Sequence, residues 1–175
     1  ASELRTRIFI NKERKRMMKN LDYLNLDANK VNGVVKGLNQ LLADFQVYYT
    51  NLRGFHWNIQ GDGFFTLHAK FEELYNDAAE KVDEIAERIL QLGSTPEHRF
   101  SSYLSASNVK ETGVVHHGHE AIAHVLDTLK EIIRQERALI QTASEANDEV
   151  TVALLDDYLE GQEKLVWMLV AFNTK

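Results

Sequence analysis

No cysteine occurs among the 175 residues, and proline occurs once, at Pro96. The absence of cysteine excludes disulfide bonds and thiolate metal sites, and it is compatible with a reducing compartment. The single proline leaves room for very long helices, which the abundance of Ala, Leu, Glu, Lys and Gln also favours. No apolar run approaches the ~20 residues of a membrane span and no signal peptide is visible. We therefore expect a cytoplasmic protein that has no membrane contact.

The formal net charge of −6 is unevenly distributed along the chain. Residues 1–19 carry seven basic and two acidic side chains, a charge of +5, so the remainder carries −11. An acidic body concentrates cations, and a basic N-terminal extension over residues 1–20 can contact DNA phosphates. That extension also contains the apolar Ile8, Phe9 and Ile10, so a non-native or purely structural extension remains the alternative.

Four long segments with helical periodicity follow the extension, at about 28–58, 64–91, 116–146 and 148–172. Asp27 and the Asn147-Asp148 pair are candidate N-caps, and Gly93 is a candidate C-cap. The connection 94–113 is long and contains FSSYLSAS, which predicts a short helix. We therefore assign residues 21–175 to one domain.

This pattern predicts an all-α, ferritin-like four-helix bundle with a short helix in the long connection between helices two and three. The long connection makes helices two and three parallel, whereas a hemerythrin-like bundle would use short loops throughout. A di-iron site inside such a bundle needs Glu-x-x-His on two helices. The sequence contains no E-x-x-H, which argues against a di-iron oxygenase of that kind.

One stretch nevertheless carries a set of metal-ligating residue types. Its members are His56, His68, Glu72, Asp83 and Glu87, with spacings of 12, 4, 11 and 4. Two imidazoles and three carboxylates suit iron. Taken singly, each residue is explained as well by a solvated helix face; together, beside an apolar stripe, they indicate a metal site.

The spacing dictates how such a site would be assembled. His68 and Asp83 are 15 residues apart, so they share one side of the helix but lie roughly 22 Å apart along its axis. Metal–ligand bonds are only about 2 Å long. One copy of the chain therefore cannot bring both pairs to one metal, and a second, antiparallel copy must supply Asp83 and Glu87 across a two-fold interface.

The stretches FHWNIQGDGFFTLHAKFEELY, VDEIAERILQLG and QEKLVWMLVAF resemble the Dps family, the mini-ferritins named as DNA-binding proteins from starved cells. The resemblance covers about residues 21–172. It implies that His56, His68 and Glu72 of one subunit and Asp83 and Glu87 of its mate form a di-iron ferroxidase site, with Trp57 beside it. Many members have Asp where this chain has Glu72. The same ligands can hold zinc or other divalent metals.

The resemblance further implies a hollow homododecamer that oxidises Fe(II), preferably with hydrogen peroxide but also with oxygen, and stores ferric mineral. It also implies a location in the bacterial cytoplasm or nucleoid. Such a protein is a ferroxidase, an oxidoreductase that protects against oxidative stress. The alternative is a DNA-binding, DNA-compacting shell with little ferroxidase activity.

Two further groups of residues remain open. Family members carry acids near the start of the last helix at three-fold pores, which here would be Asp148 and Glu149; both also fit the ordinary preference for acids at a helix N-terminus. A histidine cluster is formed by His116, His117, His119 and His124. His116, Glu120 and His124 at i, i+4 and i+8 could bind a metal, or the histidines are simply an exposed first turn.

Overall fold

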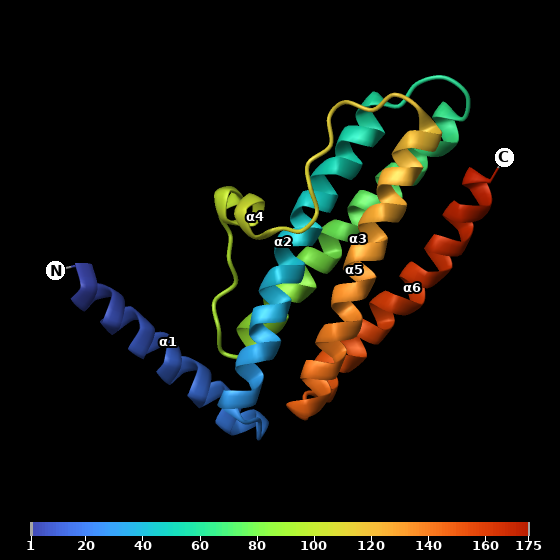
Figure 1. The fold of residues 1–175 in the computed structure, drawn as a ribbon. Coiled ribbons are helices and arrows are strands. Elements are labelled where there is room, and N and C mark those ends of the chain that lie inside the picture. Colours follow the sequence, from blue (N-terminus) through green and yellow to red (C-terminus); the bar gives the residue numbers. More distant parts are fainter. Residues whose placement is uncertain (1, 175) are drawn as a thin grey trace.

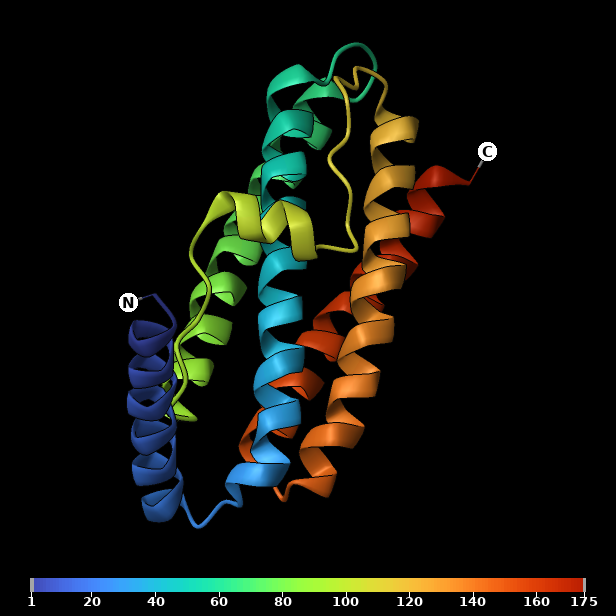
Figure 2. The same ribbon diagram turned by 60° about the vertical axis from the view of Figure 1, so that its left-hand side comes forward.

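The computed structural model describes the backbone of residues 2–174 and the side chains of that range except those of residues 2–4, 8, 13, 16 and 17. The predicted contributions of Glu3, Ile8, Glu13 and Arg16 to the N-terminal extension therefore lie outside the described side chains. Over this range the chain forms helices only (Figures 1 and 2). They are α1 (Ser2–Leu24), α2 (Ala28–Asn58), α3 (Phe64–Gln91), α4 (Phe100–Ala106), α5 (Gly118–Glu145) and α6 (Glu149–Asn173). None of the helices within residues 2–174 is long and apolar enough to cross a membrane.

The ends of the long helices follow from local chemistry. The Asp27 side chain accepts a hydrogen bond from the Asn29 backbone N–H at 2.8 Å and so caps α2. Gly63, before α3, and Gly93, after it, have φ of 79° and 78°, a conformation that costs a glycine little. The predicted bounds of α2 and α3 are confirmed. The third predicted helix starts two residues later than expected, at Gly118.

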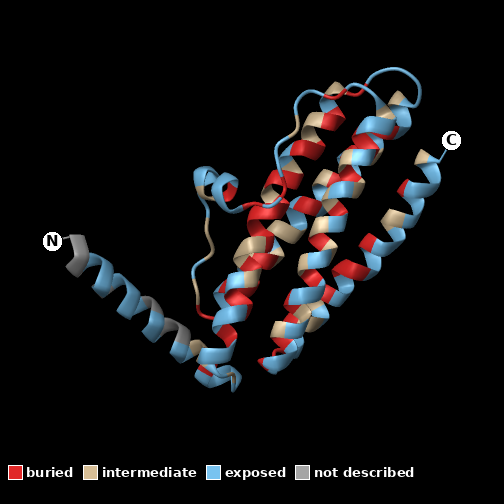
Figure 3. Cartoon of the chain, viewed as in Figure 1, coloured by how far each residue is buried: buried red, intermediate tan, exposed pale blue. Residues whose placement is uncertain are grey.

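The helices α2, α3, α5 and α6 form the bundle, and their inward faces make one core (Figure 3). α2 lies at its centre, packed against both α3 and α5, while α5 also packs on α6. Phe45, Phe55 and Phe71 are fully buried there. Burial of each such side chain contributes about 1.5–3 kcal/mol. The predicted four-helix bundle is confirmed.

The connection from α4 to α5 runs along α2 and is attached to it at intervals of seven residues. Asp44 accepts hydrogen bonds from the Ser107 hydroxyl at 2.8 Å and the Asn108 N–H at 2.6 Å. Asn51 donates to the Lys110 carbonyl at 2.9 Å. The Thr112 N–H then donates to the Asn51 side-chain oxygen. The connection ends beside the last turn of α2, where the Gln60 N–H donates to the His116 carbonyl and Nδ1 of His116 donates to the Asn58 carbonyl.

This attachment explains why α3 and α5 run parallel. The connection carries the chain back to the end of α2, the same end of the bundle at which α3 begins. There Gly118 lies so close to Leu67 that a Cβ on it would stand 2.4 Å from a Leu67 methyl. The first turns of α5 and α3 therefore start side by side, as the long connection predicts.

α1 was not predicted as a helix, and it is held to the bundle mainly near its C-terminal end. Leu21 is buried, and the Asn20 amide donates to the carbonyls of Leu90 and Gln91 at the end of α3. The rest of α1 stands away from the four-helix bundle (Figure 1). Its described basic side chains are all exposed: Arg5, Arg7, Lys12, Arg14, Lys15 and Lys19.

We predict that Asp44→Ala destabilises the bundle. Asp44 is fully buried and also accepts from Gln135 of α5 at 2.6 Å, so its loss leaves several buried donors unpaired. The free energy of unfolding should fall by about 3 kcal/mol, because each unpaired buried donor carries its desolvation cost. Urea denaturation at matched protein concentration measures the change. The control Asp127→Ala removes an exposed acid of α5 and should change stability little; an equal loss in both variants would contradict the assignment.

We predict a second effect from Glu136, a fully buried carboxyl of α5 whose pKa burial raises to about 8. Its Oε1 accepts from the Gln162 amide at 2.9 Å. The ordinary pKa is 4.5, so the folded protein binds the proton more tightly than the unfolded chain. Stability is therefore fully present below the unfolded pKa and declines as the pH rises to about 8, by roughly 1.4 kcal/mol per pH unit. Glu136→Gln, which mimics the neutral acid, should abolish this decline in pH-resolved denaturation; an identical pH profile would refute it.

Candidate metal centre

His56 of α2 and His68 of α3 lie face to face. Their ring centroids are 3.8 Å apart and their planes are inclined by 18°. Nδ1 of His56 lies 2.7 Å from the His68 carbonyl oxygen, and Nδ1 of His68 lies 2.8 Å from the His56 carbonyl oxygen. A carbonyl only accepts, so each Nδ1 carries a proton and donates it. In the neutral ring, Nε2 then keeps its lone pair free for a metal ion.

The geometry of the α2–α3 hairpin places the two histidines opposite each other. His56 stands six residues before Asp62 in the turn, and His68 stands six residues after it. In two antiparallel helices, residues equidistant from the turn lie at the same level. Gly61 and Gly63 make the turn tight, with φ of 82° and 79°. The reciprocal hydrogen bonds are therefore a consequence of where the helices break.

Aromatic side chains surround the histidine pair. The Tyr75 ring stands edge-on to His56 with centroids 5.3 Å apart, and Phe64 stacks on His68 at 5.1 Å. His56 is only 8% exposed, and His68 is half-buried. Imidazoles held in this apolar setting stay in one orientation and one tautomer. Such preorganisation suits side chains that bind a metal ion.

The predicted carboxylates have a different setting. Glu72, Asp83 and Glu87 are all exposed on α3, and none of them makes a hydrogen bond or ion pair within residues 2–174. In that same range no three His, Cys, Asp or Glu side chains lie close enough to hold one metal ion. The carboxylates are thus free for a ligand or a neighbouring subunit, and the assembly of all five ligands at one site stays a prediction.

Trp57 is turned away from the histidine pair. Its side chain is 62% exposed, and the Arg53 guanidinium lies over its ring, 4.6 Å from the centroid. Among the described residues no ring contact joins Trp57 to either histidine. The aromatic side chains that do contact the pair, Tyr75 and Phe64, were not singled out from the sequence. The seven-residue spacing from His68 to Tyr75, about two turns of α3, is the signal that could have found Tyr75.

Asp148, a candidate pore residue, is used within its own subunit. It is 1% exposed and pairs with Arg88 of α3 at 2.6 Å. It also caps α6, accepting from the Thr151 N–H at 3.0 Å and from the Thr151 hydroxyl. The N-cap alternative accounts for these contacts. Glu149 is exposed at the same helix start, and the pore interpretation of Asp148 and Glu149 stays a prediction.

The histidine cluster does not share one helix face. Because α5 begins at Gly118, His116 precedes the helix, and the i, i+4, i+8 arrangement with Glu120 and His124 does not form. Nδ1 of His119 lies 2.6 Å from the Asn173 amide oxygen, and His124 stacks on Phe55 at 6.0 Å. His117 is the N-terminal flanking residue of α5. The arrangement on which the metal-site alternative depended does not form within one subunit because the helix begins two residues late, and His116, His117 and His119 are exposed, as the other alternative expects.

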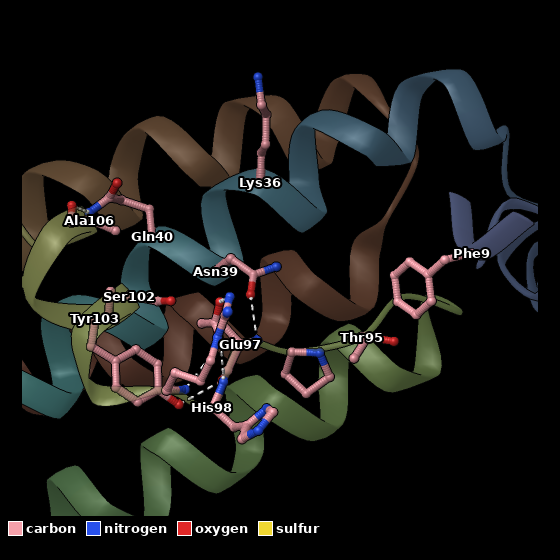
Figure 4. Close-up of a pocket in the computed structure, with 13 residues that line it drawn as sticks. Phe9, Lys36, Asn39, Gln40, Thr95, Glu97, His98, Ser102, Tyr103 and Ala106 are labelled. Atoms are coloured by element: carbon pink, nitrogen blue, oxygen red, sulfur yellow. Dashed lines mark hydrogen bonds and ion pairs between the residues drawn. The ribbon is translucent and has the colours of Figure 1, made fainter. Parts of the chain in front are cut away.

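A cavity of about 700 Å³ lies elsewhere, between the first half of α2, the 95–99 segment, α4 and Phe9 of α1 (Figure 4). The Arg99 guanidinium hydrogen-bonds the Glu97 carboxylate there and holds its pKa well below the usual range. The cavity contains none of the predicted metal ligands, so it is separate from the histidine pair.

A four-helix bundle with one long crossover, carrying an imidazole pair and free carboxylates on one helix face, defines a ferritin-like protein. The ferritin-like domain family matches residues 35–175. The chain is 55% identical, over 91% of its length, to the whole DNA protection during starvation protein of Porphyromonas gingivalis. It is 38% identical, over 77% of its length and 91% of the relative, to the protein of that name from Brevibacillus brevis.

Solved structures agree with these relatives. The Dps protein of Vibrio cholerae O1, described as a member of the ferritin-like diiron-carboxylate superfamily, superposes with a TM-score of 0.84 at 47% identity, covering 85% of this chain and 94% of the other. A Dps protein from Bacillus brevis gives 0.82 at 36% identity, covering 85% and 99%. The chain belongs to the Dps family of ferritin-like proteins.

Proposed function

We propose that this protein is a ferroxidase and iron-storage shell whose di-iron site is shared across a two-fold interface. His56, His68 and Glu72 of one subunit would bind Fe(II) together with Asp83 and Glu87 of a second subunit. The observation that carries the proposal is the reciprocal histidine pair, because its hydrogen bonds leave two Nε2 lone pairs for metal next to unpaired carboxylates on α3.

The donor set supports oxidation of iron. Neutral imidazoles and carboxylates bind Fe(II), and anionic oxygen donors stabilise Fe(III) more strongly, which lowers the potential of the couple. Two Fe(II) ions held close together can supply both electrons that hydrogen peroxide needs. The balanced reaction consumes two Fe(II), one peroxide and two protons, and yields two Fe(III) and two waters. Peroxide is then reduced without releasing hydroxyl radical, which explains a protective role against oxidative stress.

The rest of the assembly follows as part of the proposal. Twelve copies would enclose a cavity in which ferric mineral grows, and Asp148 and Glu149 would stand near an entry route for Fe(II). Oxygen is the second candidate oxidant, and zinc the second candidate ion for the same ligands. The charge of −11 outside residues 1–19 supports the attraction of Fe(II), since an acidic surface raises the local concentration of cations. The proposed location is the bacterial cytoplasm.

The test is anaerobic loading with Fe(II) followed by peroxide, in wild type, His68→Ala, Asp83→Ala and a co-assembled equal mixture of the two variants. We expect fast oxidation in wild type and loss in each variant alone. A shared site takes His68 from one chain and Asp83 from the other, and each of these native residues is present in half of the chains. In a randomly assembled mixture about a quarter of all sites should therefore be intact.

Glu160→Ala is the matched control, since it removes an exposed acid of α6 away from the proposed ligands. It should oxidise iron as wild type does. A mixture that recovers no activity, although both variants assemble normally, would show that the site is not shared between chains. Oxidation in wild type no faster than in buffer would refute the ferroxidase.

A second function, DNA binding, is favoured by α1. Six exposed basic side chains stand on a helix that leaves the bundle, and the relatives in Porphyromonas gingivalis and Brevibacillus brevis are named for protecting DNA. A basic helix of this kind can contact phosphates without reading the sequence. If the protein had little ferroxidase activity, DNA compaction would be its main function.

We predict that the triple variant Arg5→Gln, Arg7→Gln and Lys12→Gln weakens DNA binding. Each lost phosphate contact should make the slope of log affinity against log salt less negative by about 0.9, because fewer counterions are released. Electrophoretic mobility shifts at several salt concentrations measure this slope. The control pair Lys130→Gln and Lys164→Gln changes exposed charges on the bundle and should leave it unaltered. Binding that ignores salt would exclude this mode.

A further inference from the structure

Tyr75 lies on the same face of α3 as the proposed metal ligands. It follows His68 by seven residues, which is about two turns of helix and only about 20° of net rotation. Side chains of an α-helix lean toward its N-terminus. Tyr75 leans back in this way, and its ring reaches His56 on the neighbouring helix with centroids 5.3 Å apart.

Tyr49 extends the contact away from the histidine pair. It stands thirteen residues before Asp62, and Tyr75 stands thirteen after, so the hairpin places the two tyrosines at one level. Their rings meet edge to face with centroids 6.0 Å apart. Both side chains are half-buried. The rings of His56, Tyr75 and Tyr49 thus form a continuous series in which each ring is in van der Waals contact with the next.

The two tyrosines are better placed to be oxidised than Trp57. An oxidised tryptophan first becomes a radical cation, and the Arg53 charge over the Trp57 ring opposes that extra positive charge. A tyrosine loses its phenolic proton together with the electron and becomes a neutral radical. Arg53 also approaches Tyr49, at 5.5 Å from the ring centroid. Tyr75, which contacts His56 directly and has no such cation over it among the described residues, is therefore the first candidate.

We propose that Tyr75 is a redox-active residue of the iron site, and that it stores one oxidising equivalent between two successive oxidations of Fe(II). This inference rests on the proposed ferroxidase function. When peroxide accepts one electron from Fe(II), its O–O bond breaks into hydroxide and hydroxyl radical. The hydroxyl radical takes a hydrogen atom from the Tyr75 phenol, which gives water and a neutral tyrosyl radical.

The cycle closes without a further reactant. The Tyr75 radical takes one electron from a second Fe(II) and one proton from solvent, which restores the phenol and yields a second Fe(III). The total is two Fe(II) oxidised per peroxide, even where only one iron is bound at the moment of reaction. Tyr49, whose ring contacts that of Tyr75, can share the radical by passing an electron to it; Tyr49 then loses its phenolic proton to solvent and Tyr75 takes one up.

The experiment compares wild type, Tyr75→Phe, Trp57→Phe and Tyr23→Phe after loading with at most one Fe(II) per site and a limiting dose of peroxide. Freeze-quench electron paramagnetic resonance detects tyrosyl radical, and a spin trap detects escaping hydroxyl radical. We expect a tyrosyl signal in wild type that Tyr75→Phe loses. In that variant spin-trapped radical should rise, and the iron oxidised per peroxide should fall from two toward one. Tyr23→Phe removes an exposed tyrosine of α1 and should match wild type.

Mapping of oxidised peptides in wild-type protein, after excess peroxide, provides a measurement that needs no variant. Modification concentrated on Tyr75 and Tyr49, rather than on Trp57 and Tyr23, supports the proposal. Loss of the radical in Trp57→Phe but not in Tyr75→Phe would overturn it. If wild type oxidises iron rapidly and its radical is independent of Tyr75, this inference fails while the ferroxidase function stands; if wild type does not oxidise iron, both fail.

Discussion

The antiparallel packing of α2 on α3 about the turn at Asp62 is the constraint on which the rest of the site depends. Because residues at equal distance from the turn lie level, this one break in the helical pattern brings His56 to His68 and Tyr49 to Tyr75. The two histidines then use their own backbones as partners, each ring donating to the carbonyl of the other residue. A separate second layer of hydrogen-bonding side chains is unnecessary, since the hairpin itself fixes the tautomers. The orientation of the two Nε2 atoms is thereby tied to the packing of the core.

The same hairpin also organises the far side of the bundle. α2 carries Asp44, Asn51 and Asn58 at intervals of seven residues on the side that receives the crossover connection. An extended chain of eight residues spans about 26 Å, and the fourteen residues of helix from Asp44 to Asn58 span about 21 Å, so a short connection can follow α2 from Asp44 to its end. The start of α5 is thus fixed beside the start of α3. α2 therefore positions His56 on one face and sets the direction of α5 through the other.

Much of this could be predicted from the sequence, because it depends on local signals. Helical periodicity, Asp27, Gly63 and Gly93 give the bounds of α2 and α3, and the long connection gives the parallel arrangement. Two features depend on tertiary contacts and could not be predicted in that way. α5 begins at Gly118 because His116 is held by the end of α2. Asp148 is buried because Arg88 of α3 pairs with it. The orientation of Trp57, by contrast, follows from helical geometry, which points adjacent residues about 100° apart and so turns Trp57 away from His56, toward solvent and Arg53.

The incompleteness of the site within one subunit has a consequence for how iron chemistry is controlled. Roughly 22 Å of helix separates the histidine pair from Asp83, so a lone subunit offers only two imidazoles and a flanking glutamate. Such a subunit would bind Fe(II) weakly and would not stabilise Fe(III) strongly. In the proposed assembly the missing carboxylates arrive only when the interface forms, and the interface also covers the exposed acids and excludes water. Oxidation would then begin only where subunits meet. A shared site can hold a single iron when peroxide arrives, and that iron supplies only one of the two electrons that peroxide needs. In the proposed cycle the aromatic pair beside the site supplies the second electron.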